Sequence, residues 1–140
     1  HQTQAADLNG RIFLIAEDNE INAEILQELL SMEGARSVVK TDGRQALRAF
    51  ESAAPDTYDA VLMDVQMPEM DGYQATRAIR SLQRRDAGAI PIVAMTANAF
   101  SEDIAACLES GMNAHIAKPV DMDTLRFVLS GVLDSARPMI

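Results

Sequence analysis

The chain has 140 residues, 48% hydrophobic and 24% charged, which is typical of one folded globular domain and not of a disordered chain. Its 12 basic and 21 acidic residues give a net charge of −9, which argues against a nucleic-acid-binding face and against docking to an anionic membrane. The single cysteine, Cys107, excludes a disulfide framework and a cysteine-built zinc site, and it fits a reducing compartment.

The two ends of the chain differ from its middle. Residues 1–10 are polar and are interpreted as a linker, and residues 135–140 as a short tail, with one domain at residues 11–134. The longest apolar runs have the length of a strand, so none crosses a bilayer, and the opening residues lack the apolar core of a signal peptide. Because the chain begins with His1, we expect it to be a piece of a longer protein.

Short apolar runs alternate along the chain with segments of helical periodicity. The apolar runs have strand length and lie at residues 12–16, 38–39, 60–63, 92–95 and 115–117. Each is followed by a segment whose apolar side chains recur on one helix face, and these segments include Ile25, Leu47, Ile79, Leu108 and Leu129. Five strand–helix units predict an α/β fold with an open, doubly wound parallel sheet of the flavodoxin-like order 2-1-3-4-5, covered by helices on both faces.

Polar side chains follow four of the five predicted strands. Glu17 and Asp18 come after the first, Asp64 after the third, Thr96 after the fourth and Lys118 after the fifth. In the predicted order the chain reverses direction between the first and third strands, which places the three acids side by side.

Three neighbouring carboxylates repel one another by roughly 4 kcal/mol per pair at about 4 Å and an effective dielectric constant of about 20. Either one of them stays protonated or a cation lies among them. Because no histidine or cysteine accompanies these oxygens, a hard ion is expected. Mg2+ fits best because it takes one or two carboxylates and keeps waters for an incoming phosphate.

An ammonium from Lys118 and a hydroxyl from Thr96 would add two donors for an anion with several oxygens, such as a phosphoryl group. A carboxylate can accept that group as a nucleophile and form an aspartyl phosphate. Asp64 is the candidate, because it stands alone between the two metal-binding positions and the threonine–lysine pair.

Four segments carry a resemblance to a known family. They are residues 16–19 (Ala-Glu-Asp-Asn), 63–72 (Met-Asp-Val-Gln-Met-Pro-Glu-Met-Asp-Gly), 94–97 (Ala-Met-Thr-Ala) and 118–119 (Lys-Pro). In this order and spacing they resemble the receiver domain of two-component response regulators, over roughly residues 11–134. The amino-acid sequences of these segments most resemble those of the receivers of hybrid sensor histidine kinases.

The resemblance implies a role for each residue of the set. Asp64 accepts phosphate from a phosphohistidine, while Glu17, Asp18 and the backbone carbonyl of Gln66 hold Mg2+ together with Asp64 itself. Lys118 pairs with the acidic centre and then with the phosphoryl oxygens.

Further positions are implied to act in switching. Thr96 moves toward the phosphoryl group, and His115 stands at an aromatic switch position where the family more often has Tyr or Phe. A cis peptide bond is expected before Pro119. Three residues match positions that tune the lifetime of the phosphoryl group: Gln66, Ala97 and Asn98.

The implied function is a phosphorylated signalling switch in a hybrid sensor histidine kinase or a response regulator. A histidine kinase or a histidine phosphotransfer domain is the expected partner, and the fourth helix, fifth strand and fifth helix form the expected output face and a possible homodimer contact. The domain would catalyse only its own phosphorylation and dephosphorylation. We expect it in the cytoplasm, without contact of its own to membrane or nucleic acid, even where the parent chain is membrane-anchored.

Two other classes of function stay open at this point. A Mg2+-dependent phosphatase or hydrolase on the same sheet would need a second acid two residues after Asp64, where Gln66 stands. A binding module with a receiver fold that never accepts phosphate would not need the complete set of acids and lysine. Taken singly, Glu17 and Asp18 are also explained as caps of the following helix, and Lys118 as a solvated lysine.

Overall fold

The computed structural model describes residues 8–97 and 101–136, and it confirms the predicted alternation of strands and helices. The strands are β1 (Ile12–Ala16), β2 (Arg36–Lys40), β3 (Ala60–Asp64), β4 (Ile92–Thr96) and β5 (Ala114–Ala117). The helices are α1 (Glu20–Met32), α2 (Gly43–Ser52), α3 (Gly72–Arg80), α4 (Ser101–Ser110) and α5 (Met122–Ala136).

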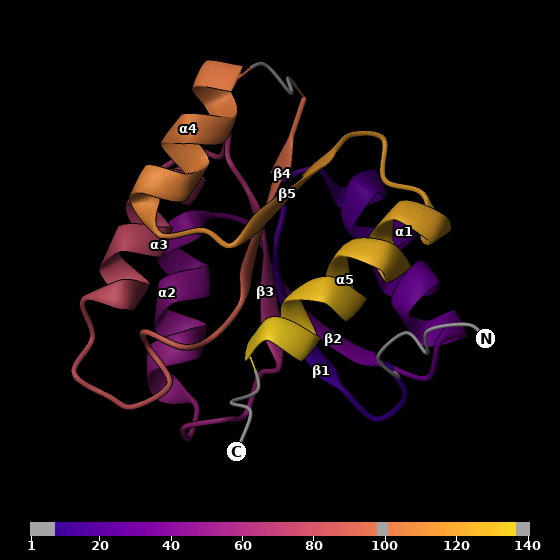
Figure 1. Ribbon diagram of the computed structural model, residues 1–140, viewed down its shortest axis with the longest axis horizontal. Helices are drawn as coiled ribbons and strands as arrows, with labels where there is room; N and C mark the ends of the chain where they lie inside the picture. The colour runs from indigo at the N-terminus through magenta and orange to yellow at the C-terminus, as the bar shows by residue number, and fades with distance from the viewer. Residues whose placement is uncertain (1–7, 98–100, 137–140) are drawn as a thin grey trace.

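Within the described residues the strands form one parallel sheet in the order β2-β1-β3-β4-β5, as predicted (Figure 1). β1 lies between β2 and β3, and Ala16 pairs with Met63 across the β1–β3 contact. The carboxyl ends of β1 and β3 are therefore neighbours, at the point where the strand order reverses.

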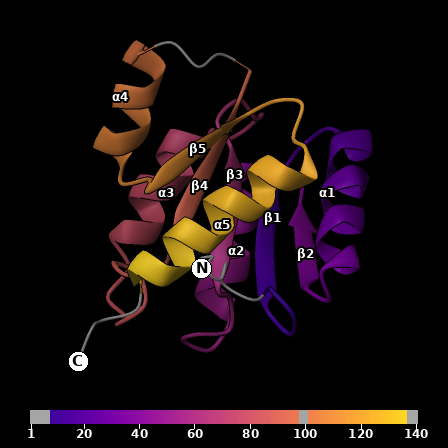
Figure 2. The same cartoon turned by 45° about the vertical axis from the view of Figure 1, so that its right-hand side comes forward.

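Helices α2, α3 and α4 cover one face of the sheet, and α1 and α5 cover the other (Figure 2). Alternate side chains of each strand enter the two cores, so that Leu14 packs with α2 and α3 while Ile15 packs with α1 and α5. The central strands are buried on both faces, which explains why they read as unbroken apolar runs in the sequence. Cys107 is buried in the first of these cores, as expected for a small apolar side chain.

The packed structure includes residues on either side of the interval 11–134. Leu8, in the segment interpreted as a linker, is 2% exposed and packs with the core beneath α1 and α5. At the other end, helix α5 continues to Ala136. A single leucine in a polar stretch has no periodic partner, so its burial leaves no pattern in the sequence. None of the described helices is both long and apolar enough to span a membrane.

Candidate functional site

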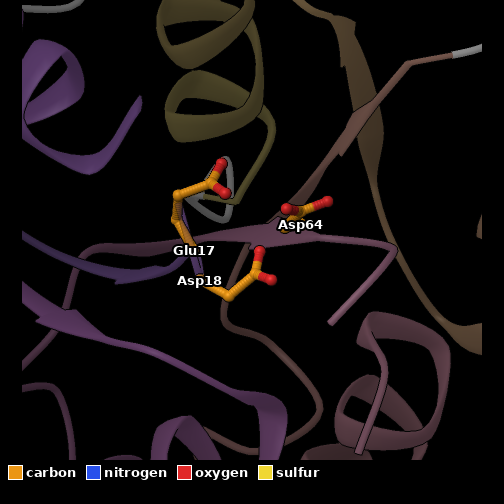
Figure 3. A group of neighbouring side chains, drawn as sticks. All are labelled: Glu17, Asp18 and Asp64. Atoms are coloured by element: carbon orange, nitrogen blue, oxygen red, sulfur yellow. The ribbon is translucent and has the colours of Figure 1, made fainter. Parts of the chain in front are cut away.

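Three carboxylates converge where β1 and β3 end (Figure 3). Glu17 and Asp18 directly follow β1, Asp64 is the last residue of β3, and one oxygen from each lies within 4.8 Å of the others. Glu17 is 1% exposed and Asp64 is 3% exposed, whereas Asp18 faces the solvent. The structure thus forms the acidic cluster that the strand order predicts, with one side open to water.

Lys118 brings a positive charge to this cluster. Its Nζ donates a hydrogen bond to Asp64 Oδ2 at 2.8 Å and lies 3.2 Å from Glu17 Oε1. Its backbone N–H donates to the carbonyl of Thr96 at 2.9 Å, which ties the end of β5 to the end of β4. Burial lowers the pKa of this ammonium, but the hydrogen bond to Asp64 and the charges of both acids outweigh burial and raise it. Lys118 therefore stays charged at neutral pH.

Glu17 is the most deeply buried acid of the cluster, and its surroundings disfavour the charged carboxylate. Burial raises its pKa first of all, and the neighbouring Asp64 raises it further. The Asn19 N–H, which donates to Oε2 at 3.1 Å, and the charge of Lys118 act in the opposite direction. Oε1 is buried and accepts no hydrogen bond of good geometry from the described part of the chain.

These features fit a hard divalent cation. The donor set consists of carboxylate oxygens, which are the ligands that Mg2+ takes, and the exposed side chain of Asp18 leaves room for bound waters. A cation would also give Glu17 Oε1, whose nearest charged neighbour is the Lys118 ammonium at 3.2 Å, a second positive partner and would offset the repulsion among the acids. The residues present can therefore hold a metal ion at the edge of the sheet.

Two further predicted positions, Gln66 and Thr96, lie near Asp64, on the following loop and on the neighbouring strand β4. The Gln66 N–H donates to Asp64 Oδ1 at 3.1 Å, so both oxygens of Asp64 are held by donors. Thr96 is buried at the end of β4, one residue beyond Met95, which is the register partner of Asp64. The cis bond expected between Lys118 and Pro119 is present.

Two further predicted positions lie on β5 and just beyond β4. Ala97 is exposed just beyond β4, and His115 is half-buried on β5, paired with Ala94. Asn98 lies outside the described residues.

The sequence left two features of this site unassigned. The cap of α1 is Asn19, whose side chain accepts from the Asn22 N–H at 3.0 Å, so the interpretation of Glu17 and Asp18 as helix caps is wrong. Asp71 caps α3, and Gly72 beside it has a further role, because a Cβ there would overlap the carbonyl oxygen of Asp64. The Asp-Gly pair was visible in the sequence, but the backbone that it approaches was not.

Replacing Glu17 by Gln is expected to raise the free energy of unfolding at pH 7 in metal-free buffer by about 1 kcal/mol. The folded-state pKa of Glu17 lies above the ordinary value of 4.5. Between these two pKa values the folded protein keeps a proton that the unfolded chain has released. Wild-type stability therefore decreases as the pH rises from 4.5 through the folded-state pKa, and it stays lower above that. Urea denaturation across this pH range should show a flatter profile for the variant.

The exposed acid Glu20, in the first turn of α1, is the matched control, and Glu20→Gln should leave the pH profile of unfolding unchanged. A Glu17→Gln protein less stable than wild type in metal-free buffer would show that the Lys118 contact outweighs the cost of burying the charge.

Comparison with known proteins agrees with this geometry. The profile of the response regulator receiver domain matches residues 13–130. The peroxide stress-activated histidine kinase mak1 of Schizosaccharomyces pombe is 38% identical over 127 residues, which is 90% of this chain and 8% of that protein. The osmosensing histidine protein kinase SLN1 of Saccharomyces cerevisiae is 38% identical over 121 residues, covering 84% of this chain and 10% of that protein. The chain thus spans only a small part of these kinases.

A solved structure shows the same likeness in three dimensions. The receiver domain of sensor histidine kinase PA1611 from Pseudomonas aeruginosa superposes with a TM-score of 0.80 at 38% identity, covering 89% of this chain and 98% of that chain. That structure holds a magnesium ion coordinated in its active site cleft. From the sheet order, the acidic cluster and these matches, the chain belongs to the response regulator receiver domain family of two-component signalling, and it is homologous to the receivers of hybrid histidine kinases.

Proposed function

We propose that Asp64 is the residue of this receiver that accepts a phosphoryl group from a phosphohistidine, and that Mg2+ is bound by Glu17, Asp18 and Asp64. The observation that carries this assignment is the position of Asp64 itself. It is a nearly buried carboxylate inside an acidic cluster, with the Lys118 ammonium 2.8 Å from one of its oxygens.

The chemistry follows from the groups around Asp64. One carboxylate oxygen attacks the phosphorus atom, the bond between phosphorus and the histidine nitrogen breaks, and the imidazole leaves as the aspartyl phosphate forms. The Gln66 N–H holds Oδ1 and thereby orients the carboxylate. Lys118 places its charge beside Oδ2, where it can neutralise the oxygens of the arriving group. Mg2+, when bound, supplies further charge neutralisation for those oxygens, and the backbone carbonyl of Gln66 completes its protein ligands.

The donor that we propose is a histidine kinase or a histidine phosphotransfer domain, in keeping with the kinases to which the chain is similar. In the switch, Thr96 at the end of β4 moves toward the phosphoryl group and His115 on β5 follows. These movements alter the surface formed by α4, β5 and α5, which also provides the homodimer contact. The large exposed side chains Leu108 and Phe127 on α4 and α5 support an interaction role for this surface.

The lifetime of the phosphoryl group is proposed to depend on three residues that follow β3 or β4 in the sequence. Gln66 is exposed two residues after Asp64, Ala97 is exposed just beyond β4, and Asn98 follows Ala97 directly in the sequence. A small residue at position 97 leaves space for the water that hydrolyses the acyl phosphate. Gln66 occupies the place where a phosphatase of the alternative class would need its second acid.

Incubation with Mg2+ and acetyl phosphate tests this function in the isolated chain. We expect one phosphoryl group per molecule by intact-protein mass spectrometry, and loss of that group in acid or hydroxylamine as an acyl phosphate. Chelation of Mg2+ with EDTA should prevent the uptake. A chain that takes up no phosphoryl group at saturating Mg2+ would support the non-phosphorylated binding module instead.

Replacing Asp18 by Ala should weaken Mg2+ binding at least about tenfold, which corresponds to about 1.4 kcal/mol. Asp18 is the exposed member of the cluster, so its loss removes a ligand without disturbing the core. Isothermal titration calorimetry with MgCl2 measures the effect, and Glu20→Ala, an exposed acid outside the cluster, is the control. If the Asp18→Ala protein and wild type bound Mg2+ with equal affinity, the metal site would not be formed by these three acids.

A further inference from the structure

Gly43, the first residue of α2, lies against the loop of residues 65–71 that follows Asp64. Its N–H donates to the carbonyl oxygen of Met70 at 3.0 Å. Helices α2 and α3 lie side by side on the same face of the sheet, so the start of α2 is next to the loop that enters α3 (Figure 1). A residue far from the acidic motifs in the sequence therefore contacts the loop that directly follows Asp64.

Position 43 requires glycine because of space. Gly43 is not among the glycines with positive φ, so its backbone is one that other residues can adopt. A Cβ built there would overlap the carbonyl oxygen of Met70, and it would lie 3.0 Å from the Met70 carbonyl carbon and 3.1 Å from Ala75 Cβ. Any side chain at this position must displace the Met70 backbone or the start of α2.

The start of α2 is held in place by its cap and by the core. Asp42 is its N-cap and is nearly buried, and its carboxylate accepts from the Gln45 N–H at 2.8 Å and from Gln45 Nε2 at 3.2 Å. Ala46 and Phe50 anchor the same helix in the core. A side chain at position 43 would therefore shift the loop and leave the helix in place.

The loop transmits such a shift to the acidic cluster through backbone contacts. The Gly72 N–H donates to the Val65 carbonyl at 3.2 Å, and the Val65 N–H donates to the Met95 carbonyl at 3.1 Å. Between these points lies Gln66, whose N–H holds Asp64 Oδ1. A loop of this length, closed at both ends, has little freedom to absorb a movement of Met70 without turning the Asp64 carboxylate.

We propose that Gly43 is a positioning residue for phosphoryl transfer. It lets α2 approach the Met70 carbonyl and so holds the loop that orients Asp64. The inference rests on the proposed phosphoacceptor role of Asp64, which the wild-type reaction tests separately.

The Gly43→Ala protein is expected to take up phosphate from acetyl phosphate about tenfold more slowly at saturating Mg2+, and to bind Mg2+ about tenfold more weakly. Gly34→Ala is the matched control, because Gly34 has φ +80° and its Cβ would meet the Asn9 side chain, at the opposite edge of the sheet. It should lose stability but keep the wild-type phosphorylation rate and Mg2+ affinity. Gly88→Ala, with open space around it, should change none of these quantities.

Two further variants separate positioning from loss of folding. Asp42→Ala removes the N-cap of α2 without adding a side chain against Met70, and it should slow phosphorylation about threefold. Asp42→Asn should restore the wild-type rate, because asparagine caps helices as well as aspartate does. The double variant Gly43→Ala, Ala75→Gly should stay slow, because the overlap with the Met70 backbone remains.

The outcomes are distinguishable. Equal rates for folded Gly43→Ala and wild type, or rates that fall equally in Gly43→Ala and Gly34→Ala, would overturn the positioning role. Recovery of the rate in the double variant would also overturn it, by assigning the effect to Ala75. If Gly43→Ala does not fold, an unchanged rate in Asp42→Ala would overturn it. Wild-type protein that takes up no phosphoryl group would instead overturn the proposed function.

Discussion

Replacing Asp64 by Asn should lower the rate of phosphoryl uptake more than about 10³-fold, to below detection in a mass-spectrometric assay. The amide keeps the size of the side chain, but its nitrogen and oxygen are poor nucleophiles, and the negative charge shared with Glu17 and Asp18 is lost. Lys118 would also lose the charged partner at 2.8 Å that holds it beside the acceptor. Uptake is measured with acetyl phosphate and saturating Mg2+.

Asp71→Asn is the matched control for this variant. Asp71 lies in the loop after Asp64 and caps α3, and asparagine caps a helix as well as aspartate does. This protein should take up phosphate at the wild-type rate. A folded Asp64→Asn protein that is labelled as fast as the control would show that the acceptor is another residue.

Replacing Arg80 by Ala should lower the free energy of unfolding by about 3 kcal/mol. Its guanidinium, at the end of α3, donates to the Gly111 carbonyl at 3.0 and 2.8 Å and to the carbonyls of Ala87 and Ile90 at 3.0 and 2.7 Å. A further hydrogen bond reaches Asn113 Oδ1 at 2.9 Å. Its removal takes this donor from the three carbonyls, where α3, the end of α4 and the approach to β5 meet, while Asn113 Oδ1 keeps the Ile92 N–H at 2.8 Å. Urea denaturation measures the loss.

The exposed Arg77, one turn earlier on α3, is the control for charge and helix propensity. Arg77→Ala should change the free energy of unfolding by less than about 0.5 kcal/mol. The free energy of unfolding of Arg80→Lys should lie between those of Arg80→Ala and Arg77→Ala. An ammonium is a point donor and cannot reproduce the hydrogen bonds of the planar guanidinium. An Arg80→Ala protein as stable as Arg77→Ala would show that water replaces these hydrogen bonds without cost.

The order of elements and the acidic cluster were predictable from the sequence for a physical reason. Parallel strands buried on both faces must be apolar throughout, and their carboxyl ends meet at one edge, so the polar residues at the carboxyl ends of β1 and β3 locate the site. The edge strand β2 gave a weaker signal. Only Val38 and Val39 are apolar, although the strand runs from Arg36 to Lys40, because an edge strand is half-exposed and tolerates polar residues.

Contacts between segments distant in the sequence were not predictable. Arg80 reads as an ordinary basic residue near the end of a helix, and its hydrogen bonds to Gly111 and Ile90 exist only in the folded structure. The approach of Gly43 to Met70 is likewise a tertiary distance. Such contacts depend on how the helices pack against the sheet, and neither hydrophobic periodicity nor motif spacing predicts that packing.

Chemical mapping of the phosphorylated residue tests the role of Asp64 most directly. Wild-type protein is phosphorylated with acetyl phosphate and Mg2+, the acyl phosphate is reduced with borohydride to homoserine, and the modified peptide is sequenced by mass spectrometry. We expect homoserine at position 64 and an unmodified carboxylate at Glu17 and Asp18. Homoserine at any other position, or a phosphoryl group that survives acid and borohydride, would contradict the assignment.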